Sequence, residues 1–561
     1  MVSSTPPSSH ATVGKPDRSP IWVQILVLLA LLTLELLLSL VMGRISWNET
    51  DVLPLARHFA DPTWVAEDWY LNQPAGYRFL FQVIFGNMAA AWGFLATSIV
   101  GRFSCYSLFA TGIVLLGRKL GLTTPFLLLA ISLFLYGGCR ELFVNCGSQQ
   151  GAIANEWMVG GLEAKALAYS VFPLAIWLLL EGQYYGMALL MGLMTSLHVL
   201  VGGWVFLATI GWLLLNRKFS SEKPWHWGVI GLIYLGASLF AIQPVLNQLT
   251  SPAVTGVIQP SAIYVFLRLP HHLNPLSWAS ERWIRPIVLL ILFTMSVTLI
   301  RRTQKADRQL GTLTSEQDAS IGLAQFTLMA LVPFVLGLII APVDTQGQLL
   351  QYYPFRLGDV MLPLSTGLLL SSVLQRSFTG QTQKIVLILC IVLLSVVFST
   401  RTVNFFNQAV ALREFPGKTQ DIDATRRDFY TWIRNNTPTD AQIISPPVKW
   451  IDFTWLTERA TIAKFKFLPQ TKLGIINWYE RLGDLGGIGS TWATIQPTQD
   501  NREEIEDQLT EGYNRLTTDQ VIALMDKYQA TYFATVRKHR LDLPIAHRNS
   551  DYVLYAKPTG M

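Results

Sequence analysis

Long apolar segments recur throughout residues 1–402 and limit what this chain can fold into. The first, 21–42, carries one charged side chain, Glu35, and is longer than the core of a signal peptide. Further apolar segments lie at 93–117, 123–137, 166–180, 184–199, 202–216, 226–247, 285–300, 322–341, 357–374 and 385–400. Together they predict an α-helical polytopic membrane protein with about eleven transmembrane helices.

The amino-acid composition agrees with a membrane protein and argues against an ordinary soluble protein. Of the 561 residues, 51% are hydrophobic and only 14% are charged, whereas soluble domains have about 25% charged residues. The net charge of +6 comes mainly from basic residues at the ends of apolar segments, so we expect a lipid bilayer and no nucleic acid as partner. Cys139 and Cys146 flank one polar loop; they form a local disulfide if that loop faces an oxidising compartment, and two free thiols are the alternative.

The distribution of basic residues predicts the orientation. The short basic loops, together with the residues before the first segment, contain Lys15, Arg18, Arg118, Lys119, Arg217, Lys218, Arg301, Arg302, Arg376 and Lys384. Basic loops of this length stay in the cytoplasm, which places the N-terminus there. The loops at 44–77, 138–165, 248–284 and 342–356 are longer and mixed in sign, so we expect them outside, together with the C-terminus in the periplasm or a thylakoid lumen.

Three parts of the chain are expected. Residues 1–20 are rich in Ser and Pro and predict a disordered cytoplasmic tail, and residues 21–402 form the transmembrane domain. Residues 403–561 alternate helical and strand patterns, which predicts a soluble extracytoplasmic α/β domain. The helices expected there are 423–435, 501–516 and 519–528, and the strands are 441–445, 460–467, 531–536 and 552–556.

The first outer loop gathers carboxylates next to the membrane. Glu49 and Asp51 lie within a few residues of the first span, and Arg57 and His58 follow one or two turns later. A carboxylate in this place can deprotonate an acceptor hydroxyl or ligate a metal ion. Glu49 and Asp51 are therefore the candidate catalytic residues, and Arg57 and His58 are candidate substrate contacts. The structural alternative is a solvated amphipathic loop.

Other ionisable side chains collect at the outer ends of later spans. They are Glu163, Lys165, His198, Arg268, His271, His272, Arg356 and Asp359. Arg and His beside a membrane can hold a phosphate, so this set is a candidate substrate-binding site. Arg356 and Asp359 are three residues apart and are expected to pair on one helix face. Structural ion pairs, a core histidine and an ordinary loop are the alternatives.

The first outer loop also carries a family resemblance. The stretch with Arg44, Asn48, Glu49, Thr50, Asp51, Ala56 and Arg57 resembles the motif after the first helix of the aminoarabinose and protein mannosyl transferases. These belong to the GT-C superfamily of membrane glycosyltransferases, whose donors are polyprenyl-phosphate sugars. Asn48 stands where that motif usually has Asp, which leaves Glu49 or Asp51 as the acid. The segments LEAKALAY, LPHHLNP and RLGDVMLPL make the chain similar to cyanobacterial multi-pass membrane proteins of unknown activity.

The resemblance implies transfer of a sugar from a polyprenyl-phosphate donor to a glycan, lipid or protein acceptor at the outer face, with a divalent cation as an open alternative. It needs Glu49, Arg268, His271 and Arg356 to converge on one outward-facing cavity. A transporter or flippase of a lipid-linked substrate would instead use mid-membrane groups such as Glu35 and Arg102. A non-catalytic membrane scaffold would need none of these groups.

Overall fold

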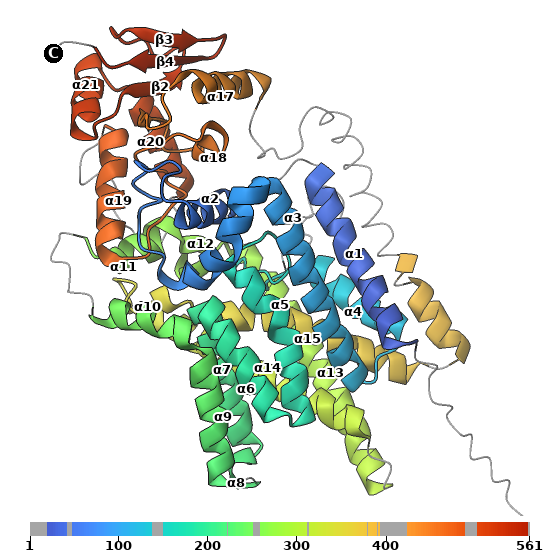
Figure 1. Cartoon of the computed structure of the whole chain (residues 1–561). Coiled ribbons are helices and arrows are strands. Elements are labelled where there is room, and N and C mark those ends of the chain that lie inside the picture. Colours follow the sequence, from blue (N-terminus) through green and yellow to red (C-terminus); the bar gives the residue numbers. More distant parts are fainter. Residues whose placement is uncertain are drawn as a thin grey trace, which may run out of the picture.

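The chain folds into a bundle of apolar helices with a small sheet and its own helices placed over one end (Figure 1). The computed structural model describes residues 19–41, 48–136, 150–221, 223–250, 258–310, 314–378, 380–389, 391–392, 423–487 and 502–558. The predicted pair Cys139 and Cys146 lies outside the described residues.

Helices stand at the predicted apolar segments. The helices of the bundle are α1 (Ile21–Val41), α3 (Phe79–Lys119), α4 (Thr124–Tyr136), α5 (Ala164–Glu181), α6 (Tyr184–Leu197), α7 (Val199–Leu215), α8 (Lys218–Ser221), α9 (Pro224–Ala237), α10 (Leu239–Thr250), α13 (Ile284–Gln309), α14 (Ser315–Ile340) and α15 (Arg356–Ser377). The connecting segments contain α2 (Glu49–Ala60), η1 (Gly76–Arg78), α11 (Pro260–Ala262), η2 (Ile263–Arg268), α12 (Pro270–Leu273), η3 (Pro275–Ser277), η4 (Ser280–Trp283) and η5 (Leu350–Tyr352). Of the last predicted segment, 385–400, only the first residues are described, and they are helical.

Two predicted spans differ from the structure. The helix expected at 93–117 begins at Phe79, because polar Gln82 is buried inside the protein rather than ending the helix, and Gly93 kinks it at φ 75° and ψ 171°. The segment 226–247 is not one straight helix: α9 and α10 are bent by 70° around Ser238. Among the described residues five helices are long and apolar enough to cross a membrane, or six if the bent pair is one span, so the expected eleven stay a prediction.

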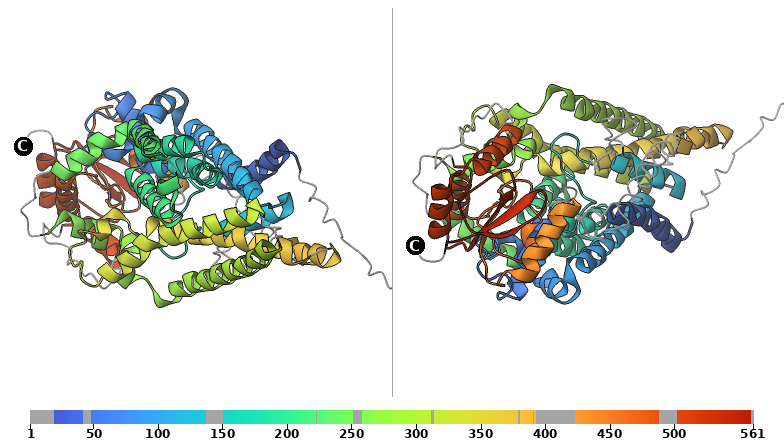
Figure 2. Two further views of the ribbon diagram at one scale, coloured as in Figure 1. Left: turned by 90° about the horizontal axis from the view of Figure 1, so that it is seen from below. Right: turned by 90° about the horizontal axis from the view of Figure 1, so that it is seen from above.

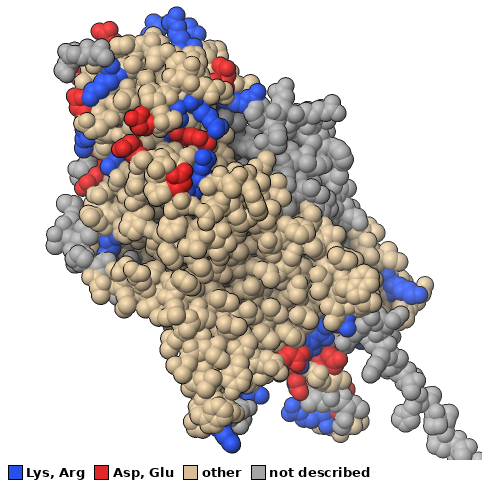
Figure 3. Space-filling model, viewed as in Figure 1, with Lys and Arg blue, Asp and Glu red and all other residues tan. Residues whose placement is uncertain are grey.

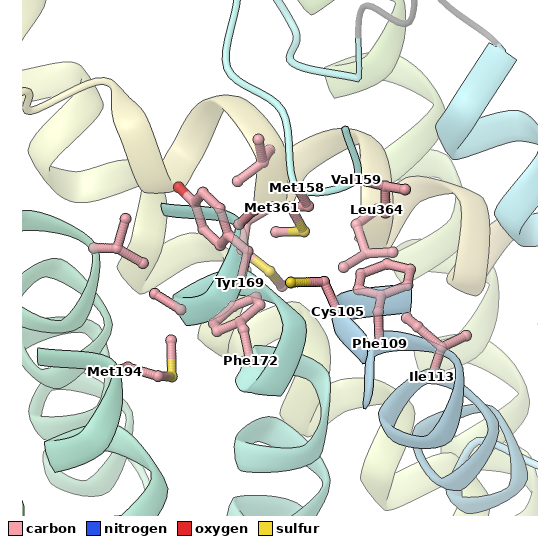
Figure 4. Packing of buried hydrophobic residues seen from close by; sticks show 14 of the residues in the cluster. Cys105, Phe109, Ile113, Met158, Val159, Tyr169, Phe172, Met194, Met361 and Leu364 are labelled. Atoms are coloured by element: carbon pink, nitrogen blue, oxygen red, sulfur yellow. The ribbon is translucent and has the colours of Figure 1, made fainter. Parts of the chain in front are cut away.

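The core of the bundle lies around α15. In its most apolar part 89% of the residues are buried, against 22% for the segment that contains α13, which faces outward. Cys105 of α3 is a buried free thiol packed against Tyr169 and Met361, which come from α5 and α15 (Figure 4). On the face drawn in Figure 3, charged side chains gather over the C-terminal region and at the opposite tips, with an uncharged belt between. This distribution agrees with a protein embedded in a bilayer.

The C-terminal region is an α/β layer structure. Its helices are α17 (Ala424–Asn436), α18 (Phe453–Thr457), α19 (Lys472–Leu485), α20 (Arg502–Asn514) and α21 (Thr518–Lys527), and its strands are β1 (Ile443–Ile444), β2 (Tyr532–Val536), β3 (Ile545–Arg548) and β4 (Tyr552–Ala556). The strand order is β1-β2-β4-β3, with β1 parallel to β2 and the other pairs antiparallel.

Alternate residues of the strands face two hydrophobic layers. Phe533 packs with residues of α19, α20 and α21, whereas the next residue, Ala534, packs with α17 and α18. Helices therefore cover both faces of the sheet, as the pattern of 403–561 predicts. The strand expected at 460–467 is wrong, because only Ala460 forms a bridge, to Gln442, and the following residues have irregular backbone with a bend and a turn.

The C-terminal region is joined to the bundle through the first outer loop and η2. Ile263 and Leu267 of η2 belong to the same hydrophobic cluster as α19 and β2, and α18 contacts α2. Tyr70 of the first outer loop stacks on Phe467 at 5.3 Å between ring centroids. Both views of Figure 2 show the red sheet on the side of the bundle away from α1. We call the surface where these parts meet the junction.

Candidate functional site

Glu49 lies in a closed ion pair within the bundle. It is the first residue of α2, its side chain is 0% exposed, and it forms a salt bridge with Arg102 of α3. Its carboxylate also accepts hydrogen bonds from Ser98 Oγ at 2.7 Å and from the backbone N–H of Leu162 at 2.7 Å. This geometry lets Glu49 tie α2, α3 and the segment before α5 together, and it leaves the carboxylate no open side.

Asp51 lies on the other side of α2 and reaches a cavity. Its Oδ1 accepts from Tyr70 Oη at 2.5 Å, and Arg78 donates to both carboxylate oxygens at 3.2 and 3.1 Å. The cavity, of ≈ 10 Å³, has room for about one water and is lined by Asp51, Asp68 and Lys464, among others. Of the two candidate acids, Asp51 lines this cavity, whereas Glu49 is fully buried in its ion pair.

Arg356, Glu156 and Lys165 form a buried network at the end of the bundle that faces the C-terminal region. Arg356 Nε donates to Glu156 Oε1 at 2.9 Å, and Lys165 Nζ lies 3.3 Å from Glu156 Oε2. These two cations lower the pKa of Glu156 to about 2 despite its burial. The other guanidinium nitrogen of Arg356 contacts His198 Nε2 at 3.2 Å, and Lys165 also lies 3.5 Å from Glu163. The structure thus brings together four of the predicted substrate-binding residues, Arg356, Lys165, Glu163 and His198, with Glu156, which the sequence analysis did not select although it lies in the same polar segment.

The expected Arg356–Asp359 pair is wrong. Asp359 instead accepts backbone N–H groups of Ile153, Ala154 and Glu156 at 2.7, 2.9 and 3.1 Å. The helix directs the two side chains differently: Arg356 turns to Glu156, while Asp359 closes a turn of the preceding segment. A side chain at Gly151 would collide with this carboxylate, which is why glycine fits there. Asp359 positions Glu156 rather than facing a cavity.

Arg268 and the two histidines lie at the junction. Arg268 is 7% exposed, donates to the backbone carbonyl of Lys466 at 2.9 Å, and its Nε has no partner. His271 Nδ1 lies 3.0 Å from a guanidinium nitrogen of Arg502, and His272 Nδ1 lies 2.6 Å from the carbonyl of Ala154. Burial lowers the pKa of all three predicted residues, and for His272 the value falls to about 3.

Lys466 connects the two groups of residues. Its Nζ donates to Asn48 Oδ1 at 2.9 Å, and Asn48 Nδ2 lies 3.4 Å from Glu163 Oε1. Burial and the neighbouring charge of Arg268 lower the pKa of Lys466 to about 8. The sequence did not reveal Lys466 or Arg502, because both belong to a distant region whose packing on η2 carries no local signal. Asn48, noted as a departure from the family motif, was the available hint.

Arg57 and His58 have structural partners. Arg57 forms a salt bridge with Glu458 at 3.2 Å and lies over the ring of Trp64. His58 is buried between the carbonyl of Trp64 at 2.8 Å and Asn72 Oδ1 at 3.3 Å. The first fastens α2 to the C-terminal region, and the second shapes the first outer loop. In the described residues they do not join the cluster around Arg268 and Arg356.

The donor set does not fit a divalent cation. Within the described part of the chain no group of three His, Cys, Asp or Glu side chains could hold a metal ion. Four acids near the junction have a cationic neighbour instead: Glu49 has Arg102, Asp51 has Arg78, Glu156 has Arg356, and Glu163 has Lys165. A fifth, Asp68, accepts backbone N–H groups of Tyr70, Leu71 and Thr461. Two cavities of the described residues, each with room for about one water, are lined by none of Glu49, Arg268, His271 and Arg356, so the convergence of these four on one cavity stays a prediction.

Comparisons with known proteins give three findings. Residues 424–485 match a family described as a domain of unknown function, DUF6798. The comparison with curated proteins gives no match. Among solved structures, the chain is similar to the Archaeoglobus fulgidus oligosaccharyltransferase in the apo form, with 10% identity over 92% of this chain and 69% of that chain and a TM-score of 0.37. It is also similar to that enzyme in complex with zinc and sulfate, with 11% identity, coverage of 91% and 68%, and a TM-score of 0.33.

Similarities with TM-scores of 0.37 and 0.33 carry no argument about the architecture of this chain, so the GT-C-like architecture expected from the first outer loop stays a prediction. At such TM-scores the likeness says nothing about the chemistry of this chain. The DUF6798 match covers one part of the C-terminal region and describes no activity.

Proposed function

We propose that this chain is an integral membrane glycosyltransferase that moves a sugar from a polyprenyl-phosphate donor to an acceptor at the extracytoplasmic face. The polar groups described above lie at one end of an apolar bundle, where a lipid-linked donor and a water-borne acceptor can meet. Lys218 of α8 lies at the opposite end, as a cytoplasmic basic loop should (Figure 1). In this proposal the N-terminus is cytoplasmic, residues 403–561 form a periplasmic or lumenal domain, and the membrane is the plasma or thylakoid membrane.

One observation carries the proposal: two cations at the junction, Arg268 and Lys466, form no salt bridge among the described residues. The four acids Glu49, Asp51, Glu156 and Glu163 are each paired with an Arg or Lys. Beyond these pairs, no carboxylate of the described residues forms a salt bridge with Arg268 or Lys466. Carboxylates act on them only from outside salt-bridge distance: Asp51 on both, Glu506 on Arg268 and Glu163 on Lys466. A bound anion in direct contact would therefore stabilise the two cations further. A phosphate at the membrane surface is an anion of the right chemistry.

The reaction follows from this arrangement. The bond between the anomeric carbon of the sugar and the phosphate oxygen breaks, and the polyprenyl phosphate leaves with the electron pair. Arg268 and Lys466 would neutralise the charge that develops on it. An acceptor oxygen forms the new bond to the anomeric carbon and gives its proton to Asp51, whose Oδ2 accepts one hydrogen bond within the described part of the chain, from Arg78.

The rival functions remain distinguishable. For a transporter or flippase, Arg102 would need to be available within the membrane, yet it is paired with Glu49, and the side chain of Glu35 lies outside the described ones. A scaffold would tolerate loss of Asp51 and Arg268. The acceptor, whether glycan, lipid or protein, is not defined by the residues described.

The test is binding and turnover of a series of polyprenyl-phosphate sugars by the purified full chain. Asp51→Asn should keep donor binding and reduce turnover by about 10²- to 10⁴-fold, because it removes the proton acceptor. Glu67→Gln is the matched control, since Glu67 is an exposed acid of the same loop. Full turnover by Asp51→Asn would remove Asp51 from the mechanism, and absence of donor binding in folded wild-type protein would refute the proposed function.

A further inference from the structure

We propose that Lys466 of the C-terminal region, together with Arg268, supplies the positive charge that holds the donor phosphate, so that phosphate binding needs no divalent cation. This inference rests on the proposed function and deepens it. It departs from the alternative of a cation held by the acids of the first outer loop.

The acids at the junction are not free to bind a metal ion. Mg²⁺ and Mn²⁺ are bound mainly through carboxylate oxygens. Arg78 donates to both oxygens of Asp51, and Arg102 donates to both oxygens of Glu49. A divalent cation would have to displace a buried guanidinium from its carboxylate, which costs the ion pair and leaves the guanidinium uncompensated. The charge of each carboxylate is therefore already balanced by a guanidinium, although Oδ2 of Asp51, which accepts one hydrogen bond from Arg78, can still take up a proton.

The surplus charge lies where a phosphate can use it. The backbone carbonyl of Lys466 accepts a hydrogen bond from Arg268, so the two residues are held side by side by their own packing. Arg268 keeps its Nε without a partner and is 7% exposed. Among the described residues the Nζ of Lys466 makes one hydrogen bond, to Asn48, and an ammonium group has two further donors. These are directional donors on a fixed frame, as phosphate binding requires.

The identity of residue 48 decides the net charge. Asn48 is neutral, so the ammonium of Lys466 beside it remains a net positive charge. An aspartate in this position would pair with Lys466 and cancel that charge. The lysine is contributed by the C-terminal region and the arginine by η2, so the site is complete only when the junction is formed.

The experiment measures binding of a short-chain polyprenyl phosphate to the purified full chain in nanodiscs, in EDTA and in Mg²⁺ or Mn²⁺. We expect the dissociation constant to agree within about twofold between these conditions. Lys466→Met should weaken binding about ten- to hundredfold, because it removes a charged hydrogen-bond donor. Lys466→Arg should retain most of the affinity, and Lys538→Met, a change at an exposed lysine of the same region, should have no effect. Thermal unfolding of each variant shows that it is folded.

The outcomes distinguish failure of the metal-independent phosphate site from failure of the proposed glycosyltransferase function. Binding that EDTA abolishes and Mn²⁺ restores overturns the inference and leaves the glycosyltransferase proposal standing. Unchanged binding by Lys466→Met overturns the role of Lys466. Equal affinity for inorganic phosphate alone would assign the site to a free phosphate and overturn the lipid-linked donor. Failure of every folded variant and of wild type to bind polyprenyl phosphate overturns the proposed function itself.

Discussion

The pair Glu49–Arg102 and the pair Arg268–Lys466 lie near the same end of the bundle, but only the first pair joins opposite charges. In the first, a buried acid meets a buried base, and the acid also accepts from Ser98 and a backbone N–H. In the second, Arg268 donates to the backbone carbonyl of Lys466, and neither side chain forms a salt bridge among the described residues. A charge whose partners are complete stabilises the fold, whereas a surplus charge marks a place where a ligand can bind.

Glu49 and Asp51, two acids on α2, also differ in their surroundings. Glu49 and Asp51 are two residues apart, and at 3.6 residues per turn their side chains leave α2 on nearly opposite sides. Glu49 therefore enters the bundle and meets Arg102, while Asp51 points to the first outer loop and its cavity. Sequence proximity made them equivalent candidates, and the helix makes them different.

The largest expected change in the free energy of unfolding comes from removing one partner of the Glu49–Arg102 ion pair. Arg102→Met leaves the carboxylate of Glu49 buried without its main counter-charge, which should cost about 3–5 kcal/mol in the free energy of unfolding. The measurement is thermal or denaturant unfolding of the detergent-solubilised chain. The double variant with Glu49→Met and Arg102→Met should recover much of the loss, because no lone charge remains.

The result that would break the comparison is a stable Glu49→Gln variant without turnover. It would make Glu49 a catalytic residue, in spite of its closed environment. A variant that is destabilised but still binds polyprenyl phosphate when folded agrees with a structural pair.

A smaller loss is expected at the turn held by Asp359. In Asp359→Asn one carboxylate oxygen becomes an NH₂ group facing a backbone donor, so one or more of the three hydrogen bonds from residues 153–156 is lost. We expect about 1–3 kcal/mol of destabilisation. Because this turn positions Glu156 against Arg356, donor binding should weaken too, which a binding titration would show. Unchanged stability would mean that the turn holds its shape without Asp359.

Individual helices were predicted from the sequence better than the contacts between distant segments at the junction. Apolar segments and caps have local signals, so α17 appears with Asp423 as its N-cap and α21 with a capping box at Thr517, close to the expected bounds. The bend at Ser238 and the irregular course after Ala460 depend on packing between distant segments. Arg268 was found because Arg beside a membrane is unusual, but Lys466 became visible only when folding placed it on Asn48.

The pH dependence of anion binding tests whether the charge of Lys466 contributes to the binding of polyprenyl phosphate. Lys466 has a pKa of about 8, below the 10.5 of an ordinary lysine, so it is charged below pH 8 and loses its charge above it. Affinity for polyprenyl phosphate should therefore fall by up to about tenfold per pH unit above 8, and Lys466→Arg should remove this fall. For folding, the unfolded chain binds more protons between pH 8 and 10.5, so the contribution of Lys466 to stability rises with pH over that window. A pH-independent affinity would contradict a charged role for Lys466.

The smallest effect is expected at the partly exposed pair between Arg57 and Glu458. Their side chains are 21% and 24% exposed, and Arg434 also reaches Glu458 at 2.9 Å. Such pairs contribute about 0–1 kcal/mol, because water screens them and ordering the side chains costs entropy. Glu458→Gln should thus change the free energy of unfolding by less than about 1 kcal/mol and leave donor binding unchanged. Weaker binding in this variant, at unchanged stability, would show that Arg57 orients the C-terminal region over the anion site. An ion pair would then contribute to ligand binding, against the contrast between paired charges that stabilise the fold and unpaired cations that bind a ligand.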